Sequence, residues 1–249
     1  MNDMVNSIKS IKSLFFGKRI YLVGSAPQIS HELYQEDMTI VCVNGSLGNL
    51  SGIASKCDLL VVDNELLNPL TSSKKENRAV ILRNNILSNY SAEYIVSSSS
   101  NEDPGGPPTN LGLPFGRYIY LSREKRLNIV RALTGESLLD HYLTSLLSTG
   151  GFAIALSFFL GAKQVFFSGF GLNQEHGAED PPHFYSEIGA KTKIESIIVD
   201  KYALTGRNHS LADSYLISRL TLKGFQLHTS NKEYFHLLSN WGYKSILNG

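Results

Sequence analysis

The stretch 148–173, STGGFAIALSFFLGAKQVFFSGFGLN, places a helix and a strand between two glycine turns, and it constrains the fold more than any other part of the chain. A small polar turn opens it, residues 152–160 are apolar, and Gly161 separates them from the apolar run 164–167. This order predicts a turn, a helix, a strand and a turn. Because apolar strands alternate with helical patterns elsewhere in the chain, we expect an α/β fold with a mostly parallel sheet flanked by helices.

The turn Ser148-Thr149-Gly150 ahead of that helix has the composition of an anion site. Glycine lets backbone N–H groups approach a ligand closely, and a helix N-terminus offers unpaired donors and a partial positive charge. A nucleotide phosphate would suit this position. A helix start packed in an α/β core without a ligand has the same glycine pattern, so the turn alone leaves both interpretations open.

Two predicted strands also end in small polar residues. Residues 20–23 are followed by Gly24 and Ser25, and residues 39–43 are followed by Asn44. In a parallel sheet the carboxyl ends of the strands form one edge, where nucleotides bind. We therefore expect Ser25 and Asn44 to face the same crevice. Neither turn has the Gly-x-Gly-x-x-Gly pattern of a dinucleotide-binding site, so a dinucleotide is not indicated.

The remaining segments complete one predicted domain over residues 1–249. The Ser-, Pro- and Gly-rich loop 97–114 and the polar loop 172–190 are typical of an active-site lid or of a disordered loop. Further strands are expected at 58–62, 79–82, 94–96 and 225–228, and helices at 136–147 and 211–220. The run Arg117, Arg123, Lys125, Arg126 and Arg131 fits a solvated helix face better than an anionic substrate path.

The amino-terminal segment has an amphipathic pattern, in which Ile8, Ile11, Leu14 and Phe15 recur at helical spacing between lysines. A helix docked on the domain explains so short a stripe better than a helix on a membrane surface, although peripheral membrane contact is the alternative. No apolar run is long enough to span a bilayer, and the first residues lack a signal-peptide cleavage pattern.

Composition places the protein among ordinary soluble globular proteins. A hydrophobic content of 42%, a charged content of 18% and a net charge of +1 do not indicate nucleic-acid binding. Cys42 and Cys57 lie in or beside apolar runs, and two cysteines are too few for a disulfide framework. We expect two reduced, buried thiols and a cytoplasmic location, with contact at the inner membrane face as the alternative.

Two histidines are candidate proton carriers. His183 and His209 both follow glycine turns on the same side of the predicted sheet, and a neutral imidazole near pH 7 can take a proton from a hydroxyl nucleophile. Either histidine taken singly is more often structural.

Four segments, in this order, resemble the motifs of the sialyltransferase superfamily, which includes eukaryotic-type sialyltransferases and bacterial relatives that use CMP-activated sugars. Residues 23–27 with 43–45 resemble the large sialyl motif, and 148–171, from Ser-Thr-Gly to Gly-Phe-Gly, is similar to the small sialyl motif. His183-Phe184-Tyr185 looks like the short His-aromatic motif, and His209 resembles the histidine of the last motif. The resemblance covers roughly residues 19–230.

The sequence departs from the family pattern at three places. Ser25 stands where the family usually has asparagine, and Asp213 lies near, but not in register with, the acidic residue after the final histidine. Cys42 and Cys57 do not match the family's bridge between its long motifs. Related bacterial enzymes transfer Kdo from CMP-Kdo, so sialic acid and Kdo both stay open as the sugar.

The resemblance implies a Rossmann-like fold of the GT-A type and a bacterial glycosyltransferase of lipopolysaccharide or capsule biosynthesis. The enzyme would move an acidic keto-sugar from a CMP donor to an oligosaccharide or glycolipid hydroxyl. His209 would be the general base, and His183 would donate to the departing phosphate. The residues assigned to the CMP donor are Gly24, Ser25, Asn44, Ser148, Thr149, Gly150, Gly169, Phe170, Gly171 and Tyr185.

Two expectations concern what accompanies this activity. No Asp-x-Asp metal pattern is visible, and a CMP donor carries a single phosphate, so we expect catalysis without a metal or another cofactor. The alternative from another class is a non-catalytic nucleotide- or glycan-binding module on the same fold.

Overall fold

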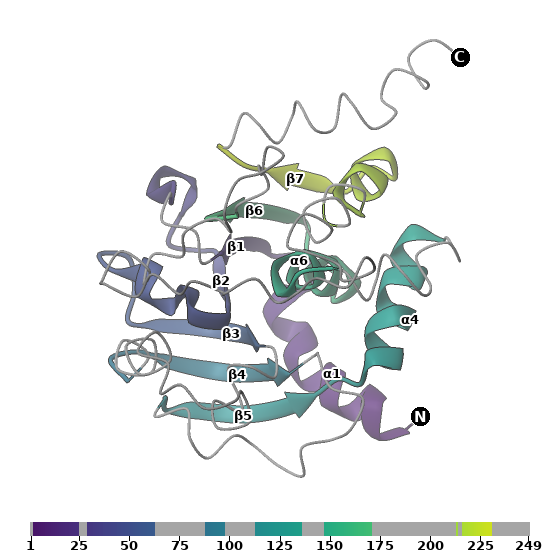
Figure 1. Ribbon diagram of the computed structural model, residues 1–249, viewed down its shortest axis with the longest axis horizontal. Helices are drawn as coiled ribbons and strands as arrows, with labels where there is room; N and C mark the ends of the chain where they lie inside the picture. Colours follow the sequence, from purple (N-terminus) through teal and green to yellow (C-terminus); the bar gives the residue numbers. More distant parts are fainter. Residues whose placement is uncertain are drawn as a thin grey trace, which may run out of the picture.

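The computed structural model (Figure 1) describes residues 2–24, 29–62, 88–97, 113–135, 147–170, 213 and 216–230. The described strands form one seven-stranded sheet in the order β5-β4-β3-β2-β1-β6-β7, and every neighbouring pair is parallel. This sheet confirms the predicted α/β architecture. Its strands are β1 (Arg19–Val23), β2 (Thr39–Val43), β3 (Lys56–Val62), β4 (Ser91–Ser97), β5 (Phe115–Tyr120), β6 (Gln164–Ser168) and β7 (Gln226–His228).

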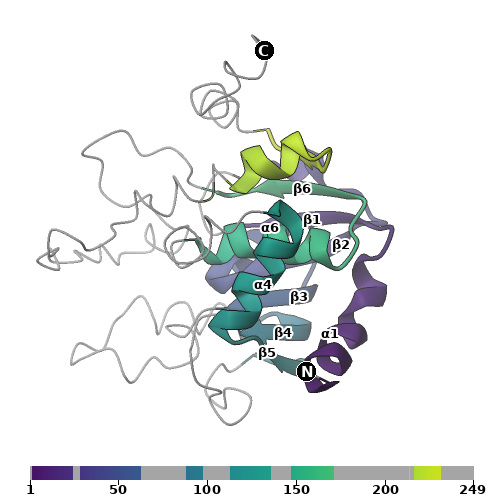
Figure 2. The same cartoon turned by 90° about the vertical axis from the view of Figure 1, so that its right-hand side faces the viewer.

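Two apolar layers cover the two faces of the sheet, and strand β1 shows the division. Ile20 and Leu22 belong to one layer, whereas Tyr21 and Val23 belong to the other, as the alternation of side chains along a strand requires. In Figure 2 the strands are stacked from β6 down to β5. The first layer contains α1 (Asn2–Phe15), α4 (Arg123–Thr134), α6 (Thr149–Phe159) and a helix over residues 216–222, and the second contains η1 (His31–Leu33) and η2 (Asn44–Leu50).

Helix α6 is the central helix of the first layer. Ser148 caps its first turn, and every residue from 150 to 158 is buried. The helix contacts β1, β2, β3 and β6. A helix that is apolar on all sides is stable only when other elements surround it, which is the position that α6 occupies. Its start therefore lies at the carboxyl edge of the central strands, because a crossover helix runs antiparallel to the strands that it joins.

Helix α1 docks on the domain as predicted. Ile8, Ile11 and Phe15 are buried in the same core layer as α6, while Lys9 and Lys12 are exposed. A membrane-surface helix would need this same apolar side, so the docked position does not support membrane contact through it. Across the described parts of the chain, no helix is both long enough and apolar enough to cross a membrane.

Several other expectations can be compared with the structure. The strands expected at 58–62, 94–96 and 225–228 are confirmed as parts of β3, β4 and β7, and both cysteines are free and buried. Strand β5 was not predicted. The strand expected at 79–82, most of the helix expected at 136–147 and nearly all of the two proposed lid loops lie outside the described residues. The lid, the GT-A variant and the single domain stay predictions.

The cationic run divides between two environments. Arg123 and Arg131 are exposed on α4, as the solvated-face interpretation predicts, whereas Arg117 is exposed on strand β5 and not on a helix. Arg126 is buried at 8% exposure on α4, which the sequence did not indicate.

Candidate functional site

The strand order reverses at β1, which marks the region where an open α/β sheet binds ligands. From β1 the chain builds β2 to β5 on one side, and it then returns to place β6 on the other side of β1. In such sheets the ligand binds outside the carboxyl ends of the strands at this switch point. The segments after β1, β2 and β6 and the start of α6 all converge there.

The ends of β1 and β6 touch through two glycines. The Gly24 N–H donates to the Ser168 carbonyl oxygen at 2.7 Å. A Cβ atom on Gly24 would lie 2.1 Å from the carbonyl oxygen of Gly169, and Gly169 itself has φ +77°. Two backbones can approach this closely only without side chains. Backbone contact between the strand ends therefore accounts for both glycines.

Gly150, in the first turn of α6, packs against an aromatic ring. A Cβ atom on Gly150 would lie 2.1 Å from Cε1 of Phe170, so the ring fills the space that glycine leaves open. Phe170 also meets Phe167 edge-on, with the ring centroids 5.4 Å apart. These contacts connect the start of α6 with the turn after β6, which are the two ends of the segment 148–171. The backbone N–H is therefore the group of Gly150 that can contact a ligand.

Half-buried Ser148 and buried Asp213 form a hydrogen-bonded pair at the start of α6. The Ser148 N–H donates to Oδ1 of Asp213 at 3.0 Å, and the Ser148 hydroxyl donates to Oδ2. The same hydroxyl accepts from the Gly151 N–H at 2.9 Å, which caps the helix. Asp213 is 4% exposed. A carboxylate is favoured at this place by the partial positive charge of the helix N-terminus.

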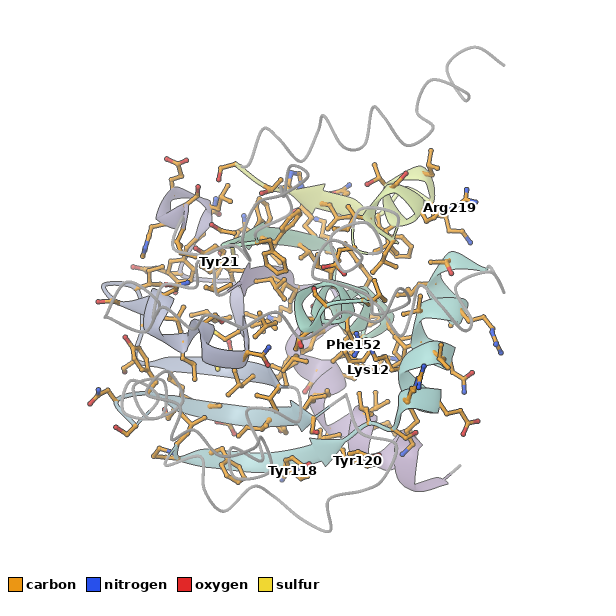
Figure 3. The ribbon with its side chains drawn as sticks, in the orientation of Figure 1. Lys12, Tyr21, Tyr118, Tyr120, Phe152 and Arg219 are labelled. Atoms are coloured by element: carbon orange, nitrogen blue, oxygen red, sulfur yellow. The ribbon has the colours of Figure 1, made fainter. Side chains whose placement is uncertain are left out.

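Arg126 holds the same turn from α4. Its guanidinium donates to the carbonyl oxygens of Leu147 and Ser148, the latter at 3.3 Å. Its Cζ lies 4.9 Å from the ring centroid of Phe152, which is labelled on α6 in Figure 3. A buried positive charge and a buried negative charge therefore both bind the polypeptide around Ser148.

The end of β2 faces the start of α6. Asn44 has φ 49°, a left-handed conformation that asparagine tolerates better than most residues. Its Nδ2 donates to the Thr149 hydroxyl oxygen at 3.4 Å, and both side chains are half-buried. This contact joins the end of β2 to the first turn of α6 at the switch point.

Helix η2 ties the end of β2 to the end of β1. The Ser46 hydroxyl donates to the Val23 carbonyl at 2.7 Å and accepts from the Val43 N–H at 2.8 Å. Asn49 Nδ2 donates to the Gly24 carbonyl at 2.8 Å. These bonds satisfy backbone groups that the strands leave unpaired where they end.

A second set of hydrogen bonds fixes the segment around Ser30, between β1 and β2. The Ser30 N–H donates to the Ser168 hydroxyl oxygen at 2.6 Å, and the phenol of Tyr21 donates to the Ser30 carbonyl at 3.3 Å. Burial raises the pKa of Tyr21 to about 12, so its phenol is neutral and acts as a donor at physiological pH.

The structure brings together all of the candidate residues that it describes. Gly24, Asn44, Gly169, Phe170 and the turn 148–150 all lie at the carboxyl edge near the switch point. The remaining candidates, Ser25, Gly171, His183, Tyr185 and His209, lie outside the described residues. Their assignments stay predictions.

Sequence reasoning missed two residues of this site. Asp213 was noted only for lying out of register with a family motif, and Arg126 was assigned to a solvated face. The available signal for Asp213 was an acidic residue four positions after His209. Within the described ranges, no group of three or more His, Cys, Asp or Glu side chains is arranged to hold a metal ion.

Comparison with known proteins gives a fold but no sequence relative. No family model matches the sequence, and no curated protein is similar to it. Solved structures do match. The sialyltransferase CstII from Campylobacter jejuni, in complex with CMP, matches with a TM-score of 0.52 and 14% identity over 85% of this chain and 80% of that chain.

A second match comes from the same organism. The monofunctional α-2,3-sialyltransferase Cst-I of Campylobacter jejuni matches with a TM-score of 0.50 and 13% identity, over 86% of this chain and 75% of that chain. At these identities the likeness shows a shared fold. The described sheet thus has the fold of these sialyltransferases.

Proposed function

We propose that this protein is a glycosyltransferase that transfers an acidic keto-sugar, sialic acid in the first place and Kdo as the alternative, from a CMP donor to a hydroxyl of an oligosaccharide or glycolipid. The observation that carries the proposal is the Asn44–Thr149 contact at the start of α6, on the switch point of a sheet whose fold is shared with CMP-bound CstII. The motif resemblance supports the same activity. Two buried free thiols support a cytoplasmic location.

The proposed reaction is a single displacement. The acceptor oxygen forms a bond to the anomeric carbon of the sugar while the bond from that carbon to the phosphate oxygen breaks, and CMP leaves. His209 takes the proton of the acceptor hydroxyl, and His183 donates to the departing phosphate. Asn44, Thr149 and the backbone N–H of Gly150 bind the nucleotide. We propose that no metal takes part.

The test is release of CMP from CMP-sialic acid and from CMP-Kdo, with and without glycan acceptors. We expect release from one donor, undiminished by EDTA. His209→Ala should lower turnover by about 10²- to 10⁴-fold, the usual contribution of a positioned proton acceptor, and leave CMP affinity and Tm unchanged. His31→Ala is the matched control, because His31 is exposed on η1.

Each contrary outcome identifies what is wrong. Binding of CMP without turnover of either donor would favour the non-catalytic binding module. Loss of activity in EDTA that Mg²⁺ or Mn²⁺ restores would overturn metal independence alone. A His209→Ala protein that keeps more than about half of its activity would remove the general-base assignment.

A further inference from the structure

We infer that Asp213 is a positioning residue for the donor turn, by which we mean residues 148–150, and that it acts through Ser148. The inference rests on the proposed function, because the donor turn is where CMP is proposed to bind. It assigns a role in nucleotide affinity to a side chain that the family resemblance left without one.

The hydrogen bonds of Ser148 show why it is a support rather than a ligand contact. Its hydroxyl hydrogen points to Oδ2 of Asp213, and its oxygen accepts from the Gly151 N–H. Its backbone N–H is used by Oδ1. The next hydroxyl along the turn, that of Thr149, contacts Asn44 instead. The two hydroxyls therefore have separate tasks: Ser148 fixes the turn, and Thr149 faces the switch point.

The burial of Asp213 makes this support rigid. A carboxylate that is only 4% exposed is stable when hydrogen-bond donors surround it, and Ser148 supplies two of them. If Ser148 moves, the buried carboxylate loses both of these donors, which is costly. The orientation of the peptide units after Ser148 is fixed as a result.

Gly151 leaves room for the carboxylate of Asp213 because it has no side chain. A Cβ atom at this position would lie 2.1 Å from Oδ1 and 2.7 Å from Cγ of Asp213. Alanine is a better helix former than glycine, so an alanine here would stabilise α6 if the carboxylate were elsewhere. The sign of the effect of Gly151→Ala therefore reports whether Asp213 sits against the turn.

Arg126 supports the turn from the opposite side of the chain. It binds the carbonyl oxygens of Leu147 and Ser148, while Asp213 binds the N–H and hydroxyl of Ser148. Two elements that are far apart in the sequence thus hold one residue. The backbone N–H and the carbonyl oxygen of Ser148 are therefore both held by hydrogen bonds. As a result, the first turn of α6 faces the nucleotide in one orientation.

The experiment measures CMP affinity by calorimetry, well below the melting temperature of each variant. Asp213→Asn keeps the size of the side chain but cannot accept both bonds from Ser148. We expect it to weaken CMP binding by about tenfold, the factor equivalent to one charge-assisted hydrogen bond. Gly151→Ala should weaken binding similarly by displacing the carboxylate, and in turnover both variants should raise KM for the donor more than they lower kcat.

Two controls lie on the helix that follows Asp213. Leu220→Ala removes a fully buried side chain and should lower Tm at least as much as Asp213→Asn and Gly151→Ala do. It should nevertheless keep the CMP affinity of the wild-type protein. Ser218→Ala changes a buried hydroxyl of the same helix and should alter neither quantity much. Together they separate a general loss of stability from a loss of positioning.

The possible failures are distinguishable. If the wild-type protein binds no CMP, the proposed function is wrong and this inference falls with it. If the wild-type protein binds CMP and both Asp213→Asn and Gly151→Ala bind it equally well, only the inference is wrong. A Gly151→Ala protein with a raised Tm and unchanged CMP affinity would likewise overturn it.

Discussion

The two edges of the sheet use polar side chains in different ways. At the carboxyl edge, Ser46, Ser168 and Asp213 are at most 5% exposed, and each binds backbone groups of a different segment. Near the amino edge, Arg19 binds Asp37 and Lys56 binds Glu93, and the side chains of both pairs are between 32% and 67% exposed.

This difference follows from solvent. Exposed ion pairs gain little because water and salt screen them and long side chains lose entropy when they pair. Buried hydrogen bonds are costly to break, since the partner left behind cannot turn to water. The carboxyl edge therefore has one well-determined arrangement of backbone turns, which is what a binding site needs. The amino edge has no such requirement.

The largest expected effect is that of a methyl group at the contact between the ends of β1 and β6. Gly24→Ala places Cβ against the Gly169 carbonyl oxygen, and we expect a loss of about 3 kcal/mol in the free energy of unfolding, because one backbone must move. Gly17→Ala is the matched change beside the amino edge. Gly17 has φ +71° but no atom within 4 Å of its Cβ position, so we expect about 1 kcal/mol from backbone strain alone.

Urea denaturation of both variants measures this contrast. Equal losses at Gly24 and Gly17 would show that the two edges do not differ in packing.

An intermediate effect is expected from the hydroxyl of Ser46. Ser46→Ala leaves the Val43 N–H and the Val23 carbonyl without this partner in a fully buried place, which should cost about 2 kcal/mol. Ser157→Ala is the control, because the Ser157 hydroxyl only adds a bond to the Ala153 carbonyl inside α6. Thermal denaturation followed by circular dichroism compares the two. A Ser46→Ala protein as stable as Ser157→Ala would contradict the importance of this network.

The smallest effect is expected at the amino edge and in acid. The hydrogen bond and charge of Arg19 lower the pKa of Asp37 below its ordinary value of 3.8. A lowered pKa stabilises the folded protein above the ordinary value, and this contribution disappears as the pH falls through the folded value. The difference in Tm between wild type and Asp37→Asn should therefore be small at pH 7 and vanish in acid, once the pH is below the lowered pKa of Asp37 in the folded protein.

High salt provides the second arm of this test. In 1 M NaCl the difference should also shrink, since the Debye length falls to about 3 Å. A difference at Asp37 that exceeds the effect of Ser46→Ala would reverse the comparison of the two edges.

The sequence predicted the elements at the site better than the contacts between them. The strand ends at Gly24 and Asn44 and the capped start of α6 follow from local patterns, because turns and caps depend on neighbouring residues. The pairing of Ser148 with Asp213 joins segments 65 residues apart, and no periodicity encodes it. Gly150 was interpreted as access for a ligand, whereas its open side is occupied by the ring of Phe170.

Strand β5 was missed for a related reason. It is an edge strand of the described part of the sheet, in which Gly116 and Arg117 are exposed and only Ile119 is buried, so it lacks both the continuous apolar run and the regular alternation of a typical strand. Its position depends on pairing with β4, where Tyr94 lies opposite Arg117. Tertiary pairing rather than local preference determines it.

The placement of β6 beside β1 also sets the order in which the protein can assemble. Arg19 lies opposite Gln164, so β1 to β5 leave the ribosome before the partner on the other side of β1 exists. At a synthesis rate of about 5–20 residues per second, the hydrogen-bonding groups along that side wait for about 10 to 30 seconds. During this interval β1 is an open edge rich in apolar residues, which is a template for pairing with another chain. We therefore expect completion of the sheet, which needs the long return of the chain that creates the switch point, to be the step of folding most exposed to aggregation.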